Sequence, residues 1–600
     1  MKSPFGLVAS TCVLLAAPVL ALAQGRAAAA TVASDPVVEL EKFVVTDSRE
    51  LPQPESWRYG NIAGFEILSN ASNQATQRLL RDFDEFRQAL GYAWPIPQDT
   101  AQTTSLIISG RGGKFDAFKP TGSVGADVAT ATRFLKQGNR TAIVVDLQAT
   151  TLDVLDVSGT ISTETGTDAG LVSVEHDKAL YREYVRFLLS RSEPRLPAWF
   201  EEGLSQIVMK MNISSRRWIE FAKLEDPNAI SASAALTAQL NAQAVADDPD
   251  SPLLAGAPAE DRDFTAALNR RGLVRLDRFF AVTHDSPEAN NVLGSNIWAK
   301  QAYAFVHLGL YGHKGKYQKA FQTFLVRAAR EPVTEAMFKE CFGLTYKEML
   351  VVLRGYIDSP FYDSRQFRSK KDGPDLIVIP SPVALREATQ SEIGRIKGEA
   401  MILAGRRGEA RTELIAPYLR GERDPNLLAV LGLYENESGS GERARGFLEA
   451  AYAAKTTRAD ALLELARLRS AEAVAKPEGA GQRLSEAQVR SIVDPLLLAR
   501  RQPPPNYAIY DLLAETWARS AAKIAPDDAR AVIQGAMLFP SRLKLVYQCI
   551  FFAAETGDLQ SAHALADHGI KYSPEGPGKQ RFAEAKAGLP PFSGSAAPVK

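Results

Sequence analysis

Apolar side chains recur at helical and strand-like spacings between residues 59 and 212. Over residues 72–91 they fall every three or four positions, which predicts an amphipathic helix. Three short runs rich in β-branched residues, FEILSN, TTSLIISG and TAIVVDL, predict strands, and a second helix is expected from about residue 179 to 190. The alternation of strands and helices indicates a small α/β or α+β lobe over residues 59–212.

The pattern becomes helical over residues 213–365. The strongest helical segments are SNIWAKQAYAFVHLGLYG, YQKAFQTFLVRAARE and TYKEMLVVLRGYI, and each carries apolar residues at helical spacing. The segment KKDGPDLIVIPSP then brings Gly and Pro turn signals. These signals predict a linker over residues 366–384.

Small residues recur with a period of 34 residues beyond this linker. The recurring pairs are Gly398 and Gly432, Gly405 and Gly439, Ala410 and Ala444, and Pro540 and Pro574. Two antiparallel helices and their turns need about this many residues. Segments such as AMILAGRRGEARTELIAPYL and AAETGDLQSAHALADHGIKYSP resemble the tetratricopeptide repeat, although QPPPN at 502–506 interrupts the array. The resemblance implies an all-α solenoid over residues 385–590 with a tail at 591–600; the alternative is a non-repetitive helical domain.

The N-terminus carries an apolar run behind a basic residue. Met1-Lys2 precedes GLVASTCVLLAAPVLALA, and Ala21-Leu22-Ala23 supplies the small residues that signal peptidase prefers. We predict a signal peptide over 1–23 and a linker over 24–58, and hence an exported protein of the periplasm or the extracellular space. The alternative is a retained anchor, because about 18 apolar or small residues approach a membrane-spanning length. After cleavage we expect no stable membrane insertion.

Composition narrows the classes of partner and chemistry. The chain has 70 Lys and Arg residues against 70 Asp and Glu residues, so no global field attracts nucleic acid, and we expect no nucleic-acid partner. Two cysteines remain after the signal peptide, Cys341 and Cys549, which are too few and too distant for a disulfide framework. Only six histidines occur, at positions 176, 284, 307, 313, 563 and 568. This scarcity limits metal-based chemistry.

Residues 180–208, LYREYVRFLLSRSEPRLPAWFEEGLSQIV, contain the most informative motif. The stretch resembles the active-site region of gluzincin metallopeptidases (thermolysin-like, peptidase MA type), in the branch that reads H-E-Y-x-H, a helix tail and then P-x-W-x-x-E-G-x-[AS]. The tail is kept, with Trp199 and Glu202 at their expected places, and Glu183 stands at the general-base position. In that family the two histidines and the later glutamate bind zinc.

Arginine occupies both histidine positions of this motif, at Arg182 and Arg186. A guanidinium has only hydrogen-bond donors and stays protonated, so neither side chain can be a zinc ligand. We therefore expect no cofactor, and a vestigial role for Glu183. On the family geometry, the helical face with both arginines looks toward Glu202, and a guanidinium could replace the charge of the metal in a salt-bridge cluster.

Other interpretations stay open at this point. The motif could belong to two ordinary amphipathic helices with no ancestral site. His176, six residues before Arg182, could serve as a recruited ligand, although it lies off the ligand positions of the family. Neither His307 with His313 nor His563 with His568 has the i, i+4 spacing that places two ligands on one helical face.

The combined expectation is an α+β metallopeptidase-like domain followed by an all-α, tetratricopeptide-like helical-repeat solenoid. We expect an exported pseudo-peptidase without hydrolytic activity that acts in peptide or protein binding or in complex assembly, with Arg182, Arg186, Glu202 and Trp199 at the former site. One alternative is an active zinc-dependent peptidase with a rearranged metal shell. Another is a structural support whose former cleft is filled by side chains.

Overall fold

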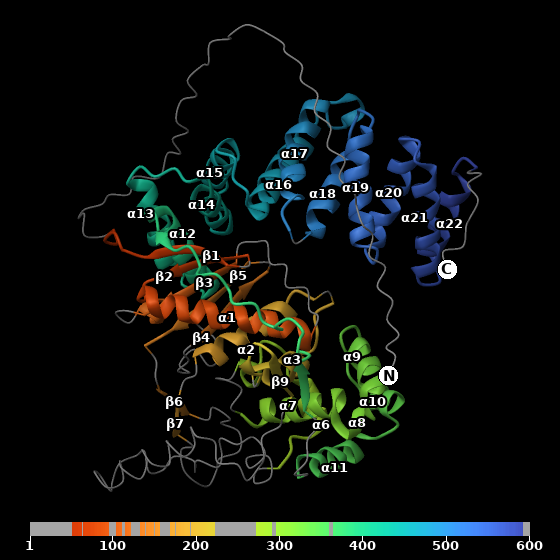
Figure 1. Ribbon diagram of the computed structural model, residues 1–600. Coiled ribbons are helices and arrows are strands. Elements are labelled where there is room, and N and C mark those ends of the chain that lie inside the picture. The colour runs from red at the N-terminus through yellow and green to blue at the C-terminus, as the bar shows by residue number, and fades with distance from the viewer. Residues whose placement is uncertain are drawn as a thin grey trace. The chain divides into compact units, whose positions relative to one another are not determined.

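The computed structural model describes residues 51–591, apart from 63, 95–103, 111–113, 122–131, 139, 149–150, 156–168, 174–175, 193, 210, 223–271, 291–295, 359–363 and 504 (Figure 1). The predicted signal peptide, most of the 24–58 linker and nearly all of the 591–600 tail lie outside the described residues. Among the helices that are described, none combines the length and the apolar content needed to cross a membrane.

A six-stranded sheet forms the centre of the N-terminal region, in the order β11-β1-β2-β3-β5-β4. The strands β2, β3 and β5 run parallel, and the remaining pairings are antiparallel. Their bounds are β1 (Arg58–Ile62), β2 (Phe65–Ser69), β3 (Thr104–Ser109), β4 (Thr132–Gln137), β5 (Arg140–Asp146) and β11 (Arg386–Glu387). The three predicted strands are the parallel ones, because only strands buried on both faces are apolar throughout. The more polar β1 and β4 escaped prediction.

Three helices position the motif. The predicted amphipathic helix is α1 (Asn73–Ala93), whose N-terminus is capped by the Ser72 side chain, and it packs on α2 (His176–Leu189). α2 also packs on β4 and β5, so it is covered on several sides. The next helix, α3 (Ala198–Met209), packs between α2 and α7 (Ile297–Leu310). One continuous apolar core joins these elements.

Residues 213–365 contain more than helices. The helices described within this range are α6 (Leu276–Ala281), α7, α8 (Gly312–Gly315), α9 (Gln318–Ala328), α10 (Glu335–Phe342) and α11 (Tyr346–Ile357). A three-stranded antiparallel sheet brackets them, formed by β8 (Asn212–Ser215), β9 (Trp218–Phe221) and β10 (Arg365–Arg368). These strands have four residues each and were too short to show a period. A further hairpin pairs β6 (Thr151–Leu155) with β7 (Ala169–Ser173).

The segment expected to be a linker, residues 366–384, is bound along its length to the N-terminal region. Its first residues belong to β10. The Gln88 side chain of α1 exchanges two hydrogen bonds with the backbone of Val378, and Gln77 does the same with Val383. Ile377 is fully buried. The Gly and Pro residues of this segment do predict turns. They do not predict the hydrogen bonds between its backbone and the side chains of α1.

After β11, the described elements longer than an isolated bridge are all helices. They are α12 (Gln390–Leu403), α13 (Arg407–Leu419), α14 (Pro425–Glu437), α15 (Gly441–Ala453), α16 (Ala459–Ala475), α17 (Glu486–Ala499), α18 (Tyr507–Ala518), α19 (Pro526–Leu538), α20 (Leu543–Glu555), α21 (Leu559–Tyr572) and α22 (Pro577–Ala587) (Figure 1). Neighbours pack in pairs, as with α12 and α13 or α14 and α15. The starts of α14 and α16 are 34 residues apart, whereas those of α16 and α18 are 48 apart, because two long connections intervene, the second containing QPPPN. The fold is thus a mixed α and β region followed by many helices.

Candidate functional site

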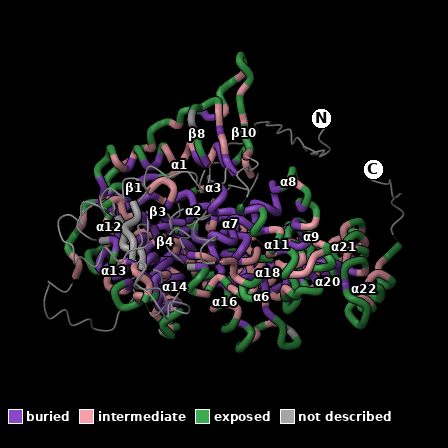
Figure 2. Tube along the Cα trace, turned by 90° about the horizontal axis from the view of Figure 1, so that it is seen from below, coloured by how far each residue is buried: buried purple, intermediate pink, exposed green. Residues whose placement is uncertain are grey.

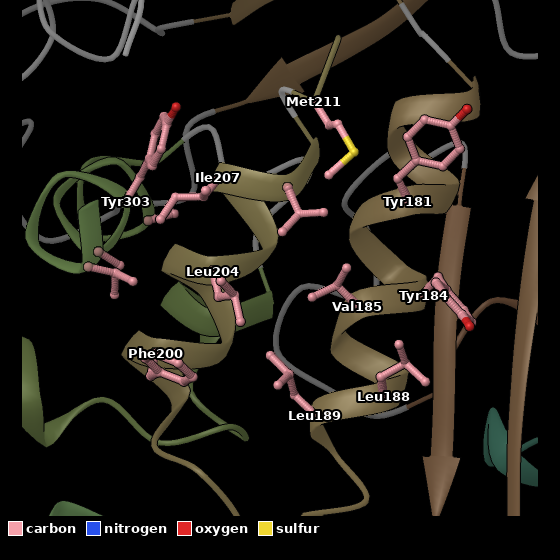
Figure 3. Packing of buried hydrophobic residues seen from close by; sticks show 14 of the residues in the cluster. Tyr181, Tyr184, Val185, Leu188, Leu189, Phe200, Leu204, Ile207, Met211 and Tyr303 are labelled. Carbon is pink, nitrogen blue, oxygen red and sulfur yellow. The ribbon is translucent and has the colours of Figure 1, made fainter. Parts of the chain in front are cut away.

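The motif occupies two helices that pack against each other. α2 carries Arg182, Glu183 and Arg186, and α3 carries Trp199 and Glu202. Figure 3 shows apolar side chains of the two helices facing each other. Val185 and Leu189 of α2 point toward Leu204 of α3 in this view, and all three are buried. This apolar contact fixes the separation of the two helices and therefore of their charged residues.

The Arg182 guanidinium lies against the Glu202 carboxylate. Its Nε donates to Glu202 Oε1 at 3.3 Å, and its Nη2 donates to Glu202 Oε2 at 2.7 Å. These two parallel contacts form a bidentate ion pair, the strongest arrangement of these groups. Gln206, one turn further along α3, donates from Nε2 to Glu202 Oε1 at 2.8 Å. Side chains of this chain thus donate three hydrogen bonds to the carboxylate of Glu202, two to Oε1 and one to Oε2.

Glu183 joins both arginines. Arg182 Nη1 donates to Glu183 Oε1 at 2.5 Å, and Arg186 Nη1 donates to Glu183 Oε2 at 3.2 Å. Within the described residues, Arg186 pairs with Glu183 rather than with Glu202, and its Nη2 donates to the carbonyl oxygen of Ala289 at 3.4 Å. The geometry therefore differs from the expected cluster, because only one of the two arginines reaches Glu202. The i, i+3 spacing on α2 brings Arg186 back to Glu183 instead.

The network is buried. The exposed fractions are 2% for Arg182, 5% for Glu183 and 3% for Glu202. Burial disfavours a charged guanidinium, but the charges of Glu202 and Glu183 outweigh this effect and raise the pKa of Arg182 above its ordinary value. Arg182 is therefore a permanent cation in this site. Among the described residues, Glu202 has no other ionic partner, whereas Glu183 also pairs with Arg186.

Trp199 lies in the core and not on a binding surface. It is 1% exposed, and its ring is surrounded by phenylalanine rings, with centroids 5.5 Å away for Phe305 and 5.8 Å away for both Phe321 and Phe324. Its role in the described structure is packing between α3 and the helices that follow. The expectation that Trp199 belongs to a binding site has no support from this position.

A second buried carboxylate escaped the sequence analysis. Glu201 is 3% exposed, and it accepts hydrogen bonds from Arg195 Nε at 3.1 Å and Nη2 at 3.4 Å. His284 Nε2 lies 3.0 Å from Glu201 Oε1. Burial tends to raise the pKa of Glu201, but His284 and Arg195 outweigh it and hold that pKa below its ordinary value. In the sequence, only the second glutamate of the segment EEG matched the motif, so Glu201 was not considered. Its contact with His284 could not be predicted, because the two residues are 83 positions apart.

The histidines that were considered as ligands are elsewhere. His176 begins α2, six residues before Arg182. His307 is fully buried on α7, where Nδ1 lies 2.6 Å from the Tyr356 hydroxyl and Nε2 lies 2.7 Å from the carbonyl oxygen of Ala222. These contacts tie α7 to α11 and to the end of β9. His307 therefore has a structural explanation.

The residues of the motif do not fit a zinc ion. Arg182 and Arg186 offer only donors, and the oxygens of Glu183 and Glu202 accept hydrogen bonds from them. Across the residues that the structure describes, no group of three or more His, Cys, Asp or Glu side chains is placed to hold a metal. No metal-dependent step can be derived from this arrangement.

Three comparisons with known proteins identified no similar protein. A scan against protein-family models, a search of curated proteins and a search of solved structures each found no match to this chain.

Proposed function

We propose that the protein is an exported, non-hydrolytic pseudo-peptidase that binds a peptide or protein partner or supports a complex, in the periplasm or outside the cell. The observation that carries this proposal is the bidentate pair between Arg182 and Glu202. In a zinc peptidase of the family that the motif resembles, a metal ion would sit beside this glutamate. A guanidinium supplies a positive charge there without activating a water molecule.

The burial of the Arg182 network favours partner binding on the helical array rather than at the motif. Arg182, Glu183 and Glu202 are nearly inaccessible, so a peptide has no direct access to the carboxylates at this position. The helices α12–α22 offer a larger surface, because an array of helix pairs exposes a long face of side chains. We therefore assign partner binding to the helical array and a supporting role to the former site.

The alternative of an active zinc peptidase with a rearranged metal shell is less well supported. Zinc at Glu202 would have to displace the Arg182 guanidinium from two hydrogen bonds and leave it buried without its main partner. Breaking a buried ion pair in this way typically costs about 3–5 kcal/mol. A metal would need several strong ligands to offset this, and Arg186 cannot be one of them.

Metal analysis of the purified protein tests the proposal. We expect far less than one zinc per chain and no chelator-sensitive cleavage of peptides. Stoichiometric zinc, or cleavage that a chelator abolishes, would overturn the proposal in favour of the peptidase. A crosslinking pull-down with the full chain then identifies the partner, and deletion of α18–α22 should remove it if the helical array is the binding surface.

The double variant R182H/R186H examines the family resemblance itself. Two histidines one turn apart, with Glu202 on the facing helix, would recreate a three-ligand set, so we expect the variant to take up zinc. The triple variant R182H/R186H/E202Q is the matched control, because it has the same histidines and lacks the carboxylate. Equal zinc uptake by both variants, or by neither, would contradict the descent of this site from a zinc site.

A further inference from the structure

The sheet formed by β8, β9 and β10 ends in a cluster of cations. Arg216 and Arg217 form the turn between β8 and β9, and Arg368, Lys370 and Lys371 lie at the end of β10 and just beyond it; we call these five residues the basic tip. The register places Arg368 opposite Trp218, and Ser369 N donates to the carbonyl oxygen of Arg217 at 3.0 Å, so the two segments adjoin.

Positive charge is in excess at the basic tip. Its five cations face two acids of the same turns, Asp372 and Asp375, which leaves a local net charge of +3 in a chain whose overall charge is zero. Asp375 lies 3.9 Å from Arg216 and 3.6 Å from Arg217. Among the described residues, Lys370 and Lys371 form no ion pair, and both are exposed. Figure 2 shows exposed chain beside β8 and β10. Their charges are available to a partner.

Exposed apolar side chains adjoin the same surface. Leu376 N and Ile377 N donate to the carbonyl oxygen of Arg216, which places the following residues, Val378 and Ile379, beside the basic tip. Val378 is 69% exposed and Ile379 55% exposed. Large aliphatic side chains at such exposure, next to several cations, match a surface that lies against lipid headgroups.

Tyr92 of α1 extends this surface. It is 44% exposed, and its ring centroid lies 5.9 Å from that of Phe367 on β10. One turn earlier on α1, Gln88 holds Val378 through two hydrogen bonds. The apolar residues and the basic tip are therefore on one continuous piece of rigid structure, because α1 and the strands support both.

We propose that the basic tip and the adjoining Tyr92, Val378 and Ile379 form a peripheral docking surface for a membrane rich in anionic lipid. Cations attract the headgroups, and the apolar side chains enter the boundary between headgroups and acyl chains. The binding is electrostatic in origin and does not span the bilayer. This surface is separate from the Arg182 network, and its existence does not depend on the function proposed above.

Vesicle sedimentation with the full chain tests this docking surface. Wild-type protein should bind vesicles of equal parts phosphatidylglycerol and phosphatidylcholine more tightly than vesicles of pure phosphatidylcholine. We call this difference in binding the anionic-lipid component, and it should vanish in about 1 M salt, where the Debye length is about 3 Å. In K370Q/K371Q the anionic-lipid component of the binding constant should fall about twenty-fivefold, because each cation near an anionic surface contributes about fivefold. The N-terminal apolar segment is present in every protein compared, so any binding it causes is common to all.

The matched control is K319Q/K523Q, which removes two exposed lysines from α9 and from the turn before α19. It should bind as the wild type does. If both variants lose binding equally, or if wild-type protein shows no preference for phosphatidylglycerol, the proposal is overturned. A third outcome would also overturn the proposal. If the wild type binds a polyglutamate peptide but no vesicles, and K370Q/K371Q loses the peptide binding, the partner is an acidic protein and not a lipid.

Discussion

At the scale of the residue, Arg182 shows how one buried side chain can bind two carboxylates without offering a ligand to a metal. It cannot ligate a metal, yet its planar guanidinium donates to both oxygens of Glu202 and to one of Glu183 in a buried site. A lysine would bring the charge without the two parallel contacts. The sequence indicated the proximity of Arg182 to Glu202 through the family resemblance. It did not indicate that Arg186 would turn to Glu183, because side-chain orientation depends on the surrounding packing.

Removal of the Glu202 charge should therefore destabilise the fold. In E202Q the buried Arg182 keeps only Glu183 as an ionic partner, and we expect the free energy of unfolding to fall by about 3 kcal/mol. Urea denaturation measures this change. The control E331Q breaks the exposed pair between Arg327 and Glu331 and should leave stability nearly unchanged. If E202Q is as mild as this control, Glu183 alone suffices to hold Arg182.

At the scale of the element, two helix pairs repeat the same contact at glycine. A Cβ atom on Gly398 would lie 2.5 Å from Leu414 Cγ, and one on Gly432 would lie 2.6 Å from Leu448 Cγ. The turns repeat as well, because Gly405 and Gly439 both have a positive φ, of 79° and 82°. The 34-residue spacing of these small residues was visible in the sequence for this reason. The longer connections after α16 and α17 were less visible, since loops tolerate insertion.

Adding a methyl group at either close contact should loosen its helix pair. We expect G398A and G432A each to lower the free energy of unfolding by about 1–3 kcal/mol, because Cβ would overlap a packed leucine. The controls are G408A and G441A, at the starts of α13 and α15, where no atom lies within 4 Å of the added Cβ. These should be neutral or slightly stabilising, since alanine restricts the unfolded chain. Equal losses at all four sites would contradict the packing argument.

At the scale of the whole molecule, α12 belongs both to the helical array and to the sheet. Arg395 of α12 pairs with Glu66 of β2 through contacts of 2.8 and 2.6 Å, and Arg458, at the start of α16, pairs with Glu399 of α12. β11, immediately before α12, extends the sheet through β1. The array is therefore not a separate module that follows a free linker. Arg395 and Glu66 are 329 positions apart, and Arg458 and Glu399 are 59 apart, so no local pattern could predict these contacts.

The link between the sheet and the array should depend on pH. Burial tends to raise the pKa of Glu66, but Arg395 outweighs it and lowers that pKa to about 2. Because the pKa of Glu66 is lower in the folded state, its ion pair adds about 3 kcal/mol to the free energy of unfolding at pH values above 4.5. This contribution is lost as the pH falls toward 2. The difference in unfolding free energy between wild type and E66Q should therefore be largest near pH 6 and shrink steadily below pH 4.5. A difference that stays constant with pH would refute this assignment.

The sequence by itself determined the elements whose pattern is local: α1, α2, the three parallel strands, several helices beyond residue 213, such as α7, α9 and α11, and the 34-residue spacing in the first helix pairs. It also determined that Arg182 and Arg186 occupy the positions at which the peptidase family that the motif resembles has its zinc-binding histidines. Only the tertiary structure decided which oxygen each arginine contacts, that Trp199 is buried, that Glu201 meets His284, and that the backbone of Val378 and Val383 is hydrogen-bonded to α1. The physical reason is that burial, ion pairing and desolvation depend on distances between segments remote in the chain, whereas periodicity records only how each segment meets its own neighbours.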